Sequence, residues 1–497
     1  MANPHDASEN LALTSDIVVV GGGNAAFSAA HAAAERGRKV IMLEKSSEEL
    51  AGGNSYYTAG ATRIVHDGLN DLKGLIEEDE RHTRTTVPPY SAEEYLGDLE
   101  KLTQGRNDPD LSRVLVEEGQ ETLRWLKKLG LKYRLMYERQ AYTNPDGTYL
   151  FWGGVHVGNV DGGEGLVKDH TNVARRFGVD IRYSHEATEL LVENGRVVGV
   201  KGTTHGSPFE VRAESTVLAA GGFESNPEMR EKYLGEGWAR AKVRGTPNNQ
   251  GTMLNAALDI GAAKAGDWNS AHSVQWDAYY PDNESNYELT NRLTRQGYFL
   301  GILVNNEGER FLDEGEDFRN YTYAKYGKVV LNQPDSIAFQ IYDSKVRPLL
   351  RAEEYDMPGI SLATADTIED IALKIGVPVE HLTRTVAAYN SGINTDRSFD
   401  PTVKDGKRSS TTPAKSNWSS PLDAAPYYAY PVTCGITFTF GGLKTDTFGR
   451  VQDERGNHIP GLYAAGEMLG GLFSNNYPGG SGLAAGAVFG RRAGSVA

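Results

Sequence analysis

The clearest pattern of apolar and polar positions lies close to the start of the chain, in the stretch DIVVVGGGNAAFSAAHAAAERGRKVIMLEK. Residues 17–20 are a short β-branched run, which is typical of a buried parallel strand. The alanine-rich residues 25–36 predict a helix that ends at Gly37, and residues 40–43 predict a second strand. The stretch therefore predicts a βαβ unit with a glycine-rich turn after its first strand.

Apolar positions continue at regular spacing along the chain and change from helical to strand periodicity. Residues 69–130 are charged, with apolar side chains at helical spacing, and Gly130 is the expected end of the last helix. Asn194 and Gly195 lie between two apolar runs, which predicts a β-hairpin. Residues 214–220 predict another buried strand that leads into a pair of glycines.

The character of the sequence changes in residues 271–433, which are rich in aromatic and polar side chains and lack the βαβ pattern. Glycine-rich α/β sequence then returns and continues to the C-terminus. We therefore predict an α/β fold in which a Rossmann-like domain of residues 16–270 and 434–497 is split by an inserted α+β capping domain of residues 271–433. Residues 1–15 are expected to form a disordered lead.

Composition narrows the class of protein. The 497 residues carry a net charge of −15, which disfavours nucleic-acid binding because such proteins present a basic face. The single cysteine, Cys434, excludes an internal disulfide, a four-cysteine iron–sulfur site and a CxxC haem site. No apolar run of about 18 residues is present, so no membrane span is predicted. The first residues lack a signal-peptide pattern, and we expect a cytoplasmic protein without a metal site.

The turn of the βαβ unit carries the pattern Gly21-x-Gly23-x-x-Ala26, which is typical of dinucleotide-binding folds. Gly21 permits the tight turn, and Gly23 lets the backbone approach a pyrophosphate at the start of the helix. Glu44 ends the second strand about 20 residues further on, where an acidic residue accepts hydrogen bonds from a ribose. Further glycine-rich runs at residues 52–63 and 459–471 favour an extended flavin nucleotide over NAD.

The runs GGNS, AAGGF, GILVNNEGERFLDE and GLYAAGEMLGG occur in this order along nearly the whole chain. In this they resemble the flavoprotein family of fumarate reductases, succinate dehydrogenases and 3-ketosteroid dehydrogenases. The runs DEGEDFRNYTYAKYG, PVTCGITFTFGGLKTD and NYPGGSGL are most similar to tricarballylate dehydrogenases. The resemblance implies a mobile capping domain and FAD as cofactor. Motif and resemblance together assign to FAD the residues Gly21, Gly23, Asn24, Ala25, Ala26, Glu44, Lys45, Gly53, Asn54, Ser55, Thr58, Gly60, Ala220, Gly221, Gly466, Glu467, Gly482 and Leu483.

The resemblance also implies chemistry at the substrate. Family members that bind FAD covalently have a histidine where Asn54 stands, so non-covalent FAD is expected. The family moves a hydride between a substrate carbon and the flavin, and the order of motifs makes Arg319 the acid/base. The alternative for Arg319 is an ion pair on a surface loop with Asp313, Glu316 or Asp317. Arg295 is the second catalytic candidate.

Two departures from fumarate reductases concern substrate recognition. The run Phe438-Thr439-Phe440 lacks their histidine, and Tyr477 stands where they have an arginine. The Tyr477 phenol either hydrogen-bonds a carboxylate or ketone of the substrate or packs against the flavin. Further substrate-binding candidates are Ser481, Thr439 and Tyr321.

The combined expectation is a FAD-dependent dehydrogenase that desaturates a small polycarboxylate, with tricarballylate oxidised to cis-aconitate as the favoured reaction. The alternatives are a desaturase of a ketone similar to the ketosteroid enzymes, a fumarate-type reductase that runs the reverse reaction, and a flavin-binding protein without catalytic activity. Electrons would leave to an external acceptor, which is a redox protein, a quinone or oxygen.

Overall fold

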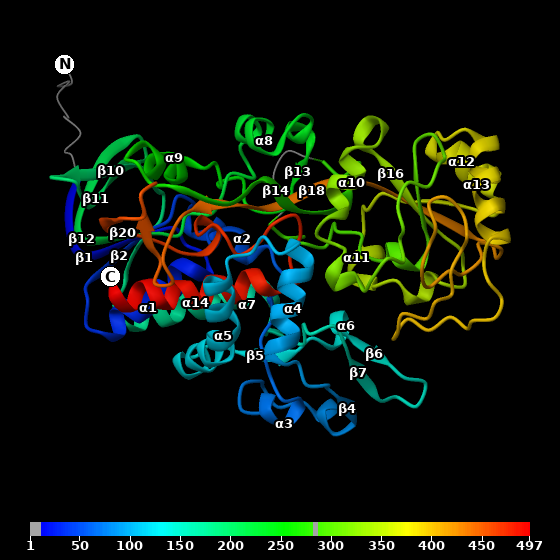
Figure 1. Ribbon diagram of the computed structural model, residues 1–497, viewed down its shortest axis with the longest axis horizontal. Helices are drawn as coiled ribbons and strands as arrows, with labels where there is room; N and C mark the ends of the chain where they lie inside the picture. The colour runs from blue at the N-terminus through cyan, green and yellow to red at the C-terminus, as the bar shows by residue number, and fades with distance from the viewer. Residues whose placement is uncertain (1–10, 282–286) are drawn as a thin grey trace, which may run out of the picture.

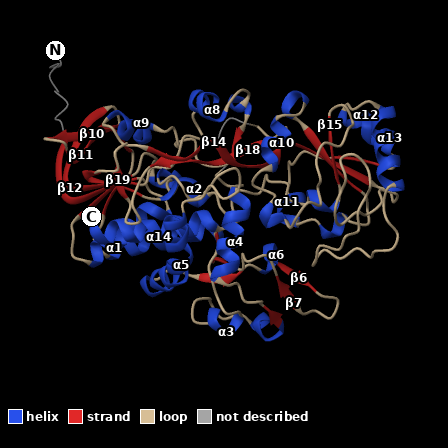
Figure 2. Cartoon of the chain, in the orientation of Figure 1, coloured by secondary structure: helices blue, strands red, loops and turns tan. Residues whose placement is uncertain are grey.

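The computed structural model describes residues 11–281 and 287–497, and Figure 1 shows two lobes joined by long strands. The first lobe holds the start of the chain and also its C-terminal helix, which lie side by side. The second lobe is built from the middle of the sequence. Figure 2 shows that helices cover the strands in both lobes. This arrangement confirms the predicted mixed α/β fold.

The first lobe is built on an eight-stranded sheet whose centre is β1 (Leu11–Val20). β1 pairs in parallel with β2 and β12 on its two sides, and β20 from the C-terminal segment pairs in parallel with β12. Four residues of β1, Ile17 to Val20, are almost fully buried, as the apolar run predicts. The other strands are β2 (Val40–Leu43), β9 (Asp180–Arg182), β10 (His185–Glu193), β11 (Arg196–Thr204), β12 (Ser207–Leu218), β19 (Arg450–Gln452) and β20 (His458–Ala464).

The expected disordered lead of residues 1–15 is wrong for its last five residues. β1 begins at Leu11, because residues 11–15 form a parallel ladder with residues 209–213 of β12. Strand pairing over such a distance is not visible in the local pattern. Residues 1–10, the rest of the expected lead, lie outside the described residues.

Helix α14 (Ser481–Val496) packs against α1 (Asn24–Glu35) at very short range. A Cβ atom at Gly490 would lie 2.4 Å from the Ala25 carbonyl oxygen, and one at Gly494 would lie 2.1 Å from that of Ala29. Only glycine therefore permits this approach. The contact places the last helix of the chain beside the glycine-rich turn at the start of α1.

The second lobe contains a six-stranded sheet in which β14 (Lys264–Asp277) and β18 (Tyr427–Leu443) are the longest strands. These two strands pair antiparallel and run between the lobes (Figure 1). The expected borders near residues 270 and 434 therefore fall inside paired strands. The division into separate domains stays a prediction. The remaining strands of this sheet are β13 (Lys242–Val243), β15 (Ile302–Asn305), β16 (Ala338–Tyr342) and β17 (Ala363–Ala365).

Two local predictions are confirmed. Gly130 ends α5 with a φ of 122°, and Asn194 and Gly195, with φ of 51° and 77°, form the turn of the β10–β11 hairpin. Within the described ranges, none of the helices is long and apolar enough to cross a membrane. The other helices are α2 (Gly53–Tyr56), α3 (Leu69–Leu72), α4 (Ala92–Thr103), α5 (Pro109–Leu129), α6 (Tyr137–Gln140), α7 (Gly162–Arg176), α8 (Pro227–Leu234), α9 (Thr252–Asp259), α10 (Tyr326–Leu331), α11 (Ala352–Tyr355), α12 (Ile368–Ile375) and α13 (Val379–Ser391). Small sheets contain β3 (Ala61–Thr62), β4 (Thr85–Thr86), β5 (Tyr133–Leu135), β6 (Ala141–Thr143), β7 (Tyr149–Phe151) and β8 (Val157–Asn159).

Candidate active site

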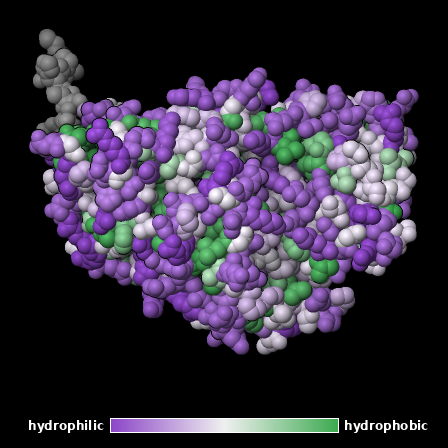
Figure 3. Space-filling model, viewed as in Figure 1, coloured by the Kyte–Doolittle hydropathy of each residue, from purple (hydrophilic) through white to green (hydrophobic). Residues whose placement is uncertain are grey.

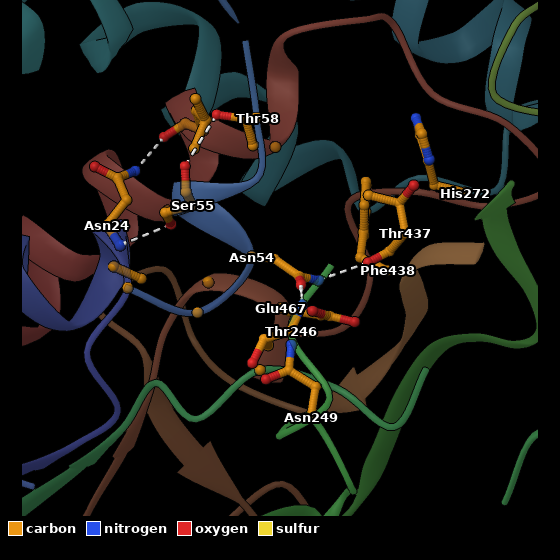
Figure 4. A pocket seen from close by; sticks show the side chains of 18 of the residues that line it. Asn24, Asn54, Ser55, Thr58, Thr246, Asn249, His272, Thr437, Phe438 and Glu467 are labelled. Carbon is orange, nitrogen blue, oxygen red and sulfur yellow. Dashed lines mark hydrogen bonds between the residues drawn. The ribbon is translucent and has the colours of Figure 1, made fainter. Parts of the chain in front are cut away.

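A large cavity extends from the glycine-rich turn before α1 to the strands that join the lobes. In Figure 4, Asn24 and Ser55 lie on one side of the view and Phe438 and His272 on the other, with Asn54 between them. We call the part around Gly21, Asn24 and Glu44 the cofactor end. The part around His272, Arg319 and Tyr477 is the substrate end.

The cofactor end is shaped by backbone that leaves no room for side chains. Gly21 has a φ of 122°, and a Cβ there would lie 2.1 Å from the carbonyl oxygen of Ala219. A Cβ at Gly22 would lie 2.1 Å from a carboxylate oxygen of Glu44. The turn therefore brings bare backbone and the start of α1 to the cavity, which suits a pyrophosphate.

Glu44 is buried at the end of β2, in the place predicted for the ribose acid. Its carboxylate accepts a hydrogen bond of 2.8 Å from the amide of Ser46. Burial raises the pKa of Glu44, and the hydrogen bonds from Ser46 and the charge of Lys45 partly oppose this shift. Glu44 and Lys45 both line the cavity, so a hydroxyl group of a ligand could donate a hydrogen bond to the Glu44 carboxylate here.

Asn24 links its own helix, α1, to three other helices at the cofactor end. Its backbone amide donates to the Ser55 hydroxyl at 2.9 Å, and its side-chain amide donates to the carbonyl of Leu483 at 2.8 Å (Figure 4). Its side-chain oxygen, Oδ1, lies 2.9 Å from Nε2 of His170, whose Nδ1 lies 3.0 Å from Nε2 of His31. Burial holds the pKa of both histidines far below the usual value, so this chain of hydrogen bonds is neutral.

Two buried carboxyl groups lie between the two ends of the cavity. Glu224 accepts hydrogen bonds from the side-chain amides of Asn54 and Asn249, at 2.6 and 2.5 Å. Glu467 accepts from the amide and the hydroxyl of Thr439, at 2.6 and 2.9 Å. Burial, together with the charge of Glu224, raises the pKa of Glu467 well above its usual value. The buried pair therefore favours a proton on Glu467.

The substrate end is dominated by two phenols in direct contact. The hydroxyls of Tyr323 and Tyr477 lie 2.5 Å apart, and both rings pack edge-on against His272. Burial raises the pKa of both phenols, so both carry a proton at neutral pH. A phenol pair uses one O–H for its mutual hydrogen bond, which leaves the other available to a ligand.

Three arginines also line the substrate end, and their partners differ. Arg139 forms ion pairs with Glu353 and Glu354. Arg319 is 4% exposed. Its acceptors among the described residues are all neutral: the side chain of Gln296 at 3.1 Å, the carbonyl of Arg139 at 3.0 Å and the side chains of Gln140 and Asn320. Arg244 donates to the hydroxyl of Thr437 at 2.9 Å.

The surface-loop alternative for Arg319 is contradicted. Asp313 contacts Ser416, Glu316 pairs with Lys325, and Asp317 pairs with Lys101. Arg319 instead lies in a short 3-10 helix, Arg319–Tyr321, that brings it into the cavity wall.

Most other predicted residues also line the cavity. They are Tyr477 and Thr439 at the substrate end and Gly21, Gly23, Asn24, Ala25, Glu44, Lys45, Gly53, Asn54, Ser55, Thr58, Ala220, Gly221, Gly466, Glu467, Gly482 and Leu483 towards the cofactor.

Five predicted residues do not line the cavity. Arg295 is fully buried in an ion pair of 2.8 Å with Asp277, which turns its guanidinium away. The Ser481 hydroxyl accepts a hydrogen bond of 2.8 Å from the Tyr95 hydroxyl, and the Tyr321 hydroxyl donates one of 2.9 Å to Asp98. Two residues serve packing, since Ala26 is buried within the core around α1 and Gly60 lies against Gly162.

Sequence reasoning missed several residues of the substrate end. They come from segments without a recognisable motif, and the useful signal was an isolated cation or aromatic next to a glycine-rich run, as in KVRGTPNNQGT around Arg244. The residues missed are Arg139, Gln140, Arg244, His272, Gln296, Asn320 and Tyr323.

The residues present fit FAD. The cofactor end offers a bare backbone turn at a helix start, a ribose acceptor in Glu44 and a second helix start at Gly480 before α14. Hydrogen-bonding side chains at Asn54, Glu467 and Thr439 continue the wall towards the substrate end. An elongated dinucleotide has partners along this whole path.

Comparison with known proteins gives the same assignment. NADH:acrylate oxidoreductase of Vibrio harveyi is 28% identical over 434 residues, which is 85% of this chain and 40% of that protein. 3-oxosteroid 1-dehydrogenase of Mycolicibacterium smegmatis is 28% identical over 352 residues, 66% of this chain and 61% of that protein. The chain thus spans less than two thirds of the length of either relative.

A solved structure of a flavocytochrome c3 fumarate reductase in an open conformation superposes with a TM-score of 0.71 at 27% identity, over 97% of this chain and 78% of that chain. The predicted resemblance to fumarate reductases and ketosteroid dehydrogenases is confirmed, and so is FAD as the cofactor. The finer resemblance to tricarballylate dehydrogenases stays a prediction. The family described as FAD binding domain matches residues 16–483, and the chain belongs to that family.

Proposed function

We propose that this protein is a FAD-dependent oxidoreductase acting on a C–C bond of a small polycarboxylate, with oxidation of tricarballylate to cis-aconitate as the favoured reaction. FAD supplies the hydride acceptor for such an oxidation when it is bound. The substrate loses a second hydrogen as a proton, which a protein group must take. The residues of the substrate end must also orient the substrate and exclude water.

Arg319 is the observation that carries this proposal. It is a buried cation in the cavity wall, and its hydrogen-bond partners among the described residues are all neutral oxygens. Leaving a buried charge without a counter-charge is costly, so a site of this kind favours an anionic ligand. Arg319 then acts as a carboxylate anchor or, as the family resemblance implies, as the group that exchanges the proton.

The phenol pair supports a role in orienting the substrate. Tyr323 and Tyr477 are protonated and share one hydrogen bond, so one O–H remains to donate to a substrate oxygen. Thr439 adds a hydroxyl nearby, although that hydroxyl already donates to Glu467. The proposed substrate therefore has oxygen acceptors close to the reacting bond.

A second candidate is a desaturase of a ketone. The same phenol pair suits a single carbonyl oxygen, and the wall formed by Phe438, Phe473 and His272 is largely apolar. The uncompensated arginines favour the polycarboxylate over this candidate, because a neutral ketone would leave their charges without a partner.

Anaerobic mixing of the purified holoenzyme with a panel of substrates separates these possibilities. We expect tricarballylate or a related di- or tricarboxylate to reduce the flavin in a single turnover, which is seen as loss of the absorbance of the oxidised flavin. Bleaching by enone-forming ketones alone would move the assignment to the second candidate. Absence of bleaching by either class would favour a flavin-binding protein without catalytic activity.

Three further parts of the proposal remain predictions. FAD is expected to be non-covalent, because Asn54 occupies the position of the attachment histidine and its amide is engaged with Glu224 and Thr437. Denaturation followed by filtration should release the flavin.

The electron acceptor is an external redox protein, quinone or oxygen, and the location is cytoplasmic. Reoxidation of the reduced enzyme by fumarate would instead favour the reductive direction.

A further inference from the structure

Arg244 is a second buried cation at the substrate end, and it has fewer partners than Arg319. It is 8% exposed and lines the cavity. One of its terminal nitrogens donates to the Thr437 hydroxyl, while its Nε has no hydrogen-bond partner. In the described parts of the chain no carboxylate lies within ion-pair distance of it.

The backbone holds Arg244 firmly in this position. It follows β13, which pairs in parallel with β18, and its own amide donates to the carbonyl of Ile436 at 2.7 Å. Its side chain therefore starts directly beside β18, the strand that presents Thr437, Phe438 and Thr439 to the cavity. A guanidinium fixed in this way is ready to bind a planar, bidentate anion such as a carboxylate.

The neighbours of Arg244 place it at the substrate end rather than with the cofactor phosphates. Burial lowers the pKa of Arg244, and Tyr323 and Tyr477 are the neighbouring groups that most oppose this shift. His272, stacked on Phe438, has an unpartnered Nδ1 and a pKa held far below its usual value by burial, so it is neutral. The surroundings thus supply hydrogen-bond donors, but no described carboxylate is in ion-pair contact with the arginine.

The comparison with the other two cavity arginines sharpens this point. Arg139 is neutralised by Glu353 and Glu354, and the terminal nitrogens of Arg319 each meet neutral protein acceptors. Arg244 alone of the three combines a buried, unpartnered nitrogen with the absence of a described carboxylate partner. A ligand anion that enters the cavity would satisfy both this nitrogen and the charge.

We infer that Arg244 binds a carboxylate of the substrate, separate from the one at Arg319, so that the site selects acids with two or more carboxylates. This inference rests on the proposed function, because it concerns the same cavity. It makes Arg244 a specificity-determining residue: an acid with one carboxylate can satisfy only one of the two cations.

Equilibrium binding to the oxidised holoenzyme tests this, with tricarballylate, succinate and the monoamide succinamate as probes. Calorimetry or the flavin difference spectrum gives the dissociation constants without turnover. We expect Arg244→Met to weaken succinate and tricarballylate binding by about 30-fold or more, the loss typical of a buried charge pair. Succinamate should lose much less, because it has only one carboxylate to place.

Two further variants keep the test decisive. Arg240→Met removes an exposed arginine of the same segment and should bind all three probes like the wild type. Arg244→Lys keeps the charge but not the fork, and we expect an intermediate loss of about tenfold. FAD content and melting temperature establish whether each variant is folded. If Arg244→Met does not fold, the comparison rests on Arg244→Lys.

The outcomes separate this inference from the proposed function. If the wild type binds succinate and both Arg244→Met and Arg244→Lys bind it with the same affinity, the role of Arg244 is overturned and the proposed function stands. A wild-type enzyme that neither binds nor is bleached by any polycarboxylate would overturn both.

Discussion

The two ends of the cavity are built by different means. The cofactor end is made mainly of backbone, with Gly21 in a conformation that favours glycine and with no space for a Cβ at Gly22. The substrate end is made of side chains, chiefly Arg244, Arg319 and the Tyr323–Tyr477 pair. One end is therefore specified by where side chains are absent, and the other by which side chains converge.

The charges of the two ends differ as well. Towards the cofactor, burial disfavours negative charge, since it raises the pKa of Glu44, Glu224 and Glu467. At the substrate end, Arg244 and Arg319 remain cations without described carboxylate partners. The outer surface is mostly hydrophilic on the face in Figure 3, and the net charge is −15. An anionic substrate is therefore attracted only locally, inside the cavity.

The largest effect on cofactor binding should come from filling the backbone turn. Gly21→Val adds side chain where a Cβ lies 2.1 Å from a carbonyl oxygen and at a φ of 122°, so the turn must move. We expect FAD affinity to fall by at least about 100-fold, corresponding to about 3 kcal/mol of strain. The FAD content of the purified variant, read from its visible absorbance, measures this.

The matched control for this change is Gly37→Ala. Gly37 also has a positive φ, 77°, but a Cβ there meets no atom within 4 Å. It lies at the opposite end of α1, so a loss of stability of about 1 kcal/mol without loss of FAD is expected. Stoichiometric FAD in Gly21→Val would contradict the backbone account of the cofactor end.

This contrast explains what could be predicted from the sequence. The Gly21–Gly23 turn, Glu44 and the β10–β11 hairpin depend on contiguous residues, and local chemistry was sufficient to find them. The start of β1 at Leu11 was missed because its partner strand lies about two hundred residues away.

The substrate end was predictable only in part. Both Arg295 and Arg319 were catalytic candidates from the sequence. In the structure, Arg295 is held inside the protein by its ion pair with Asp277, whereas Arg319 reaches the cavity. Arg244 and Tyr323 enter the site through strand pairing and lobe packing, which no local pattern records. The same holds for Ser481, whose hydroxyl bonds to a tyrosine of α4.

A smaller effect should sharpen the comparison of charges. Because the pKa of Glu467 is raised above the unfolded value of 4.5, the folded protein holds a proton that the unfolded chain releases. Its contribution to stability is therefore complete below pH 4.5 and is lost as pH rises towards the folded pKa. The loss is at most about 1.4 kcal/mol per pH unit.

Glu467→Gln removes this titration. Thermal unfolding of the FAD-free protein between about pH 5 and about pH 8 should show a shallower loss of stability for the variant than for the wild type. Glu454→Gln, at an exposed turn, should keep the wild-type slope. Equal slopes for wild type and Glu467→Gln would show that the buried pair carries no shared proton.

The central claim is that cofactor binding and substrate chemistry are carried by separable sets of residues in one cavity. Arg319→Ala tests it most directly, with FAD stoichiometry and the anaerobic bleaching rate measured on the same preparation and the exposed Arg384→Ala as control. We expect FAD at the wild-type ratio and bleaching by the best polycarboxylate slowed about 1,000-fold. Bleaching at the wild-type rate, or loss of FAD from Arg319→Ala alone, would contradict the account.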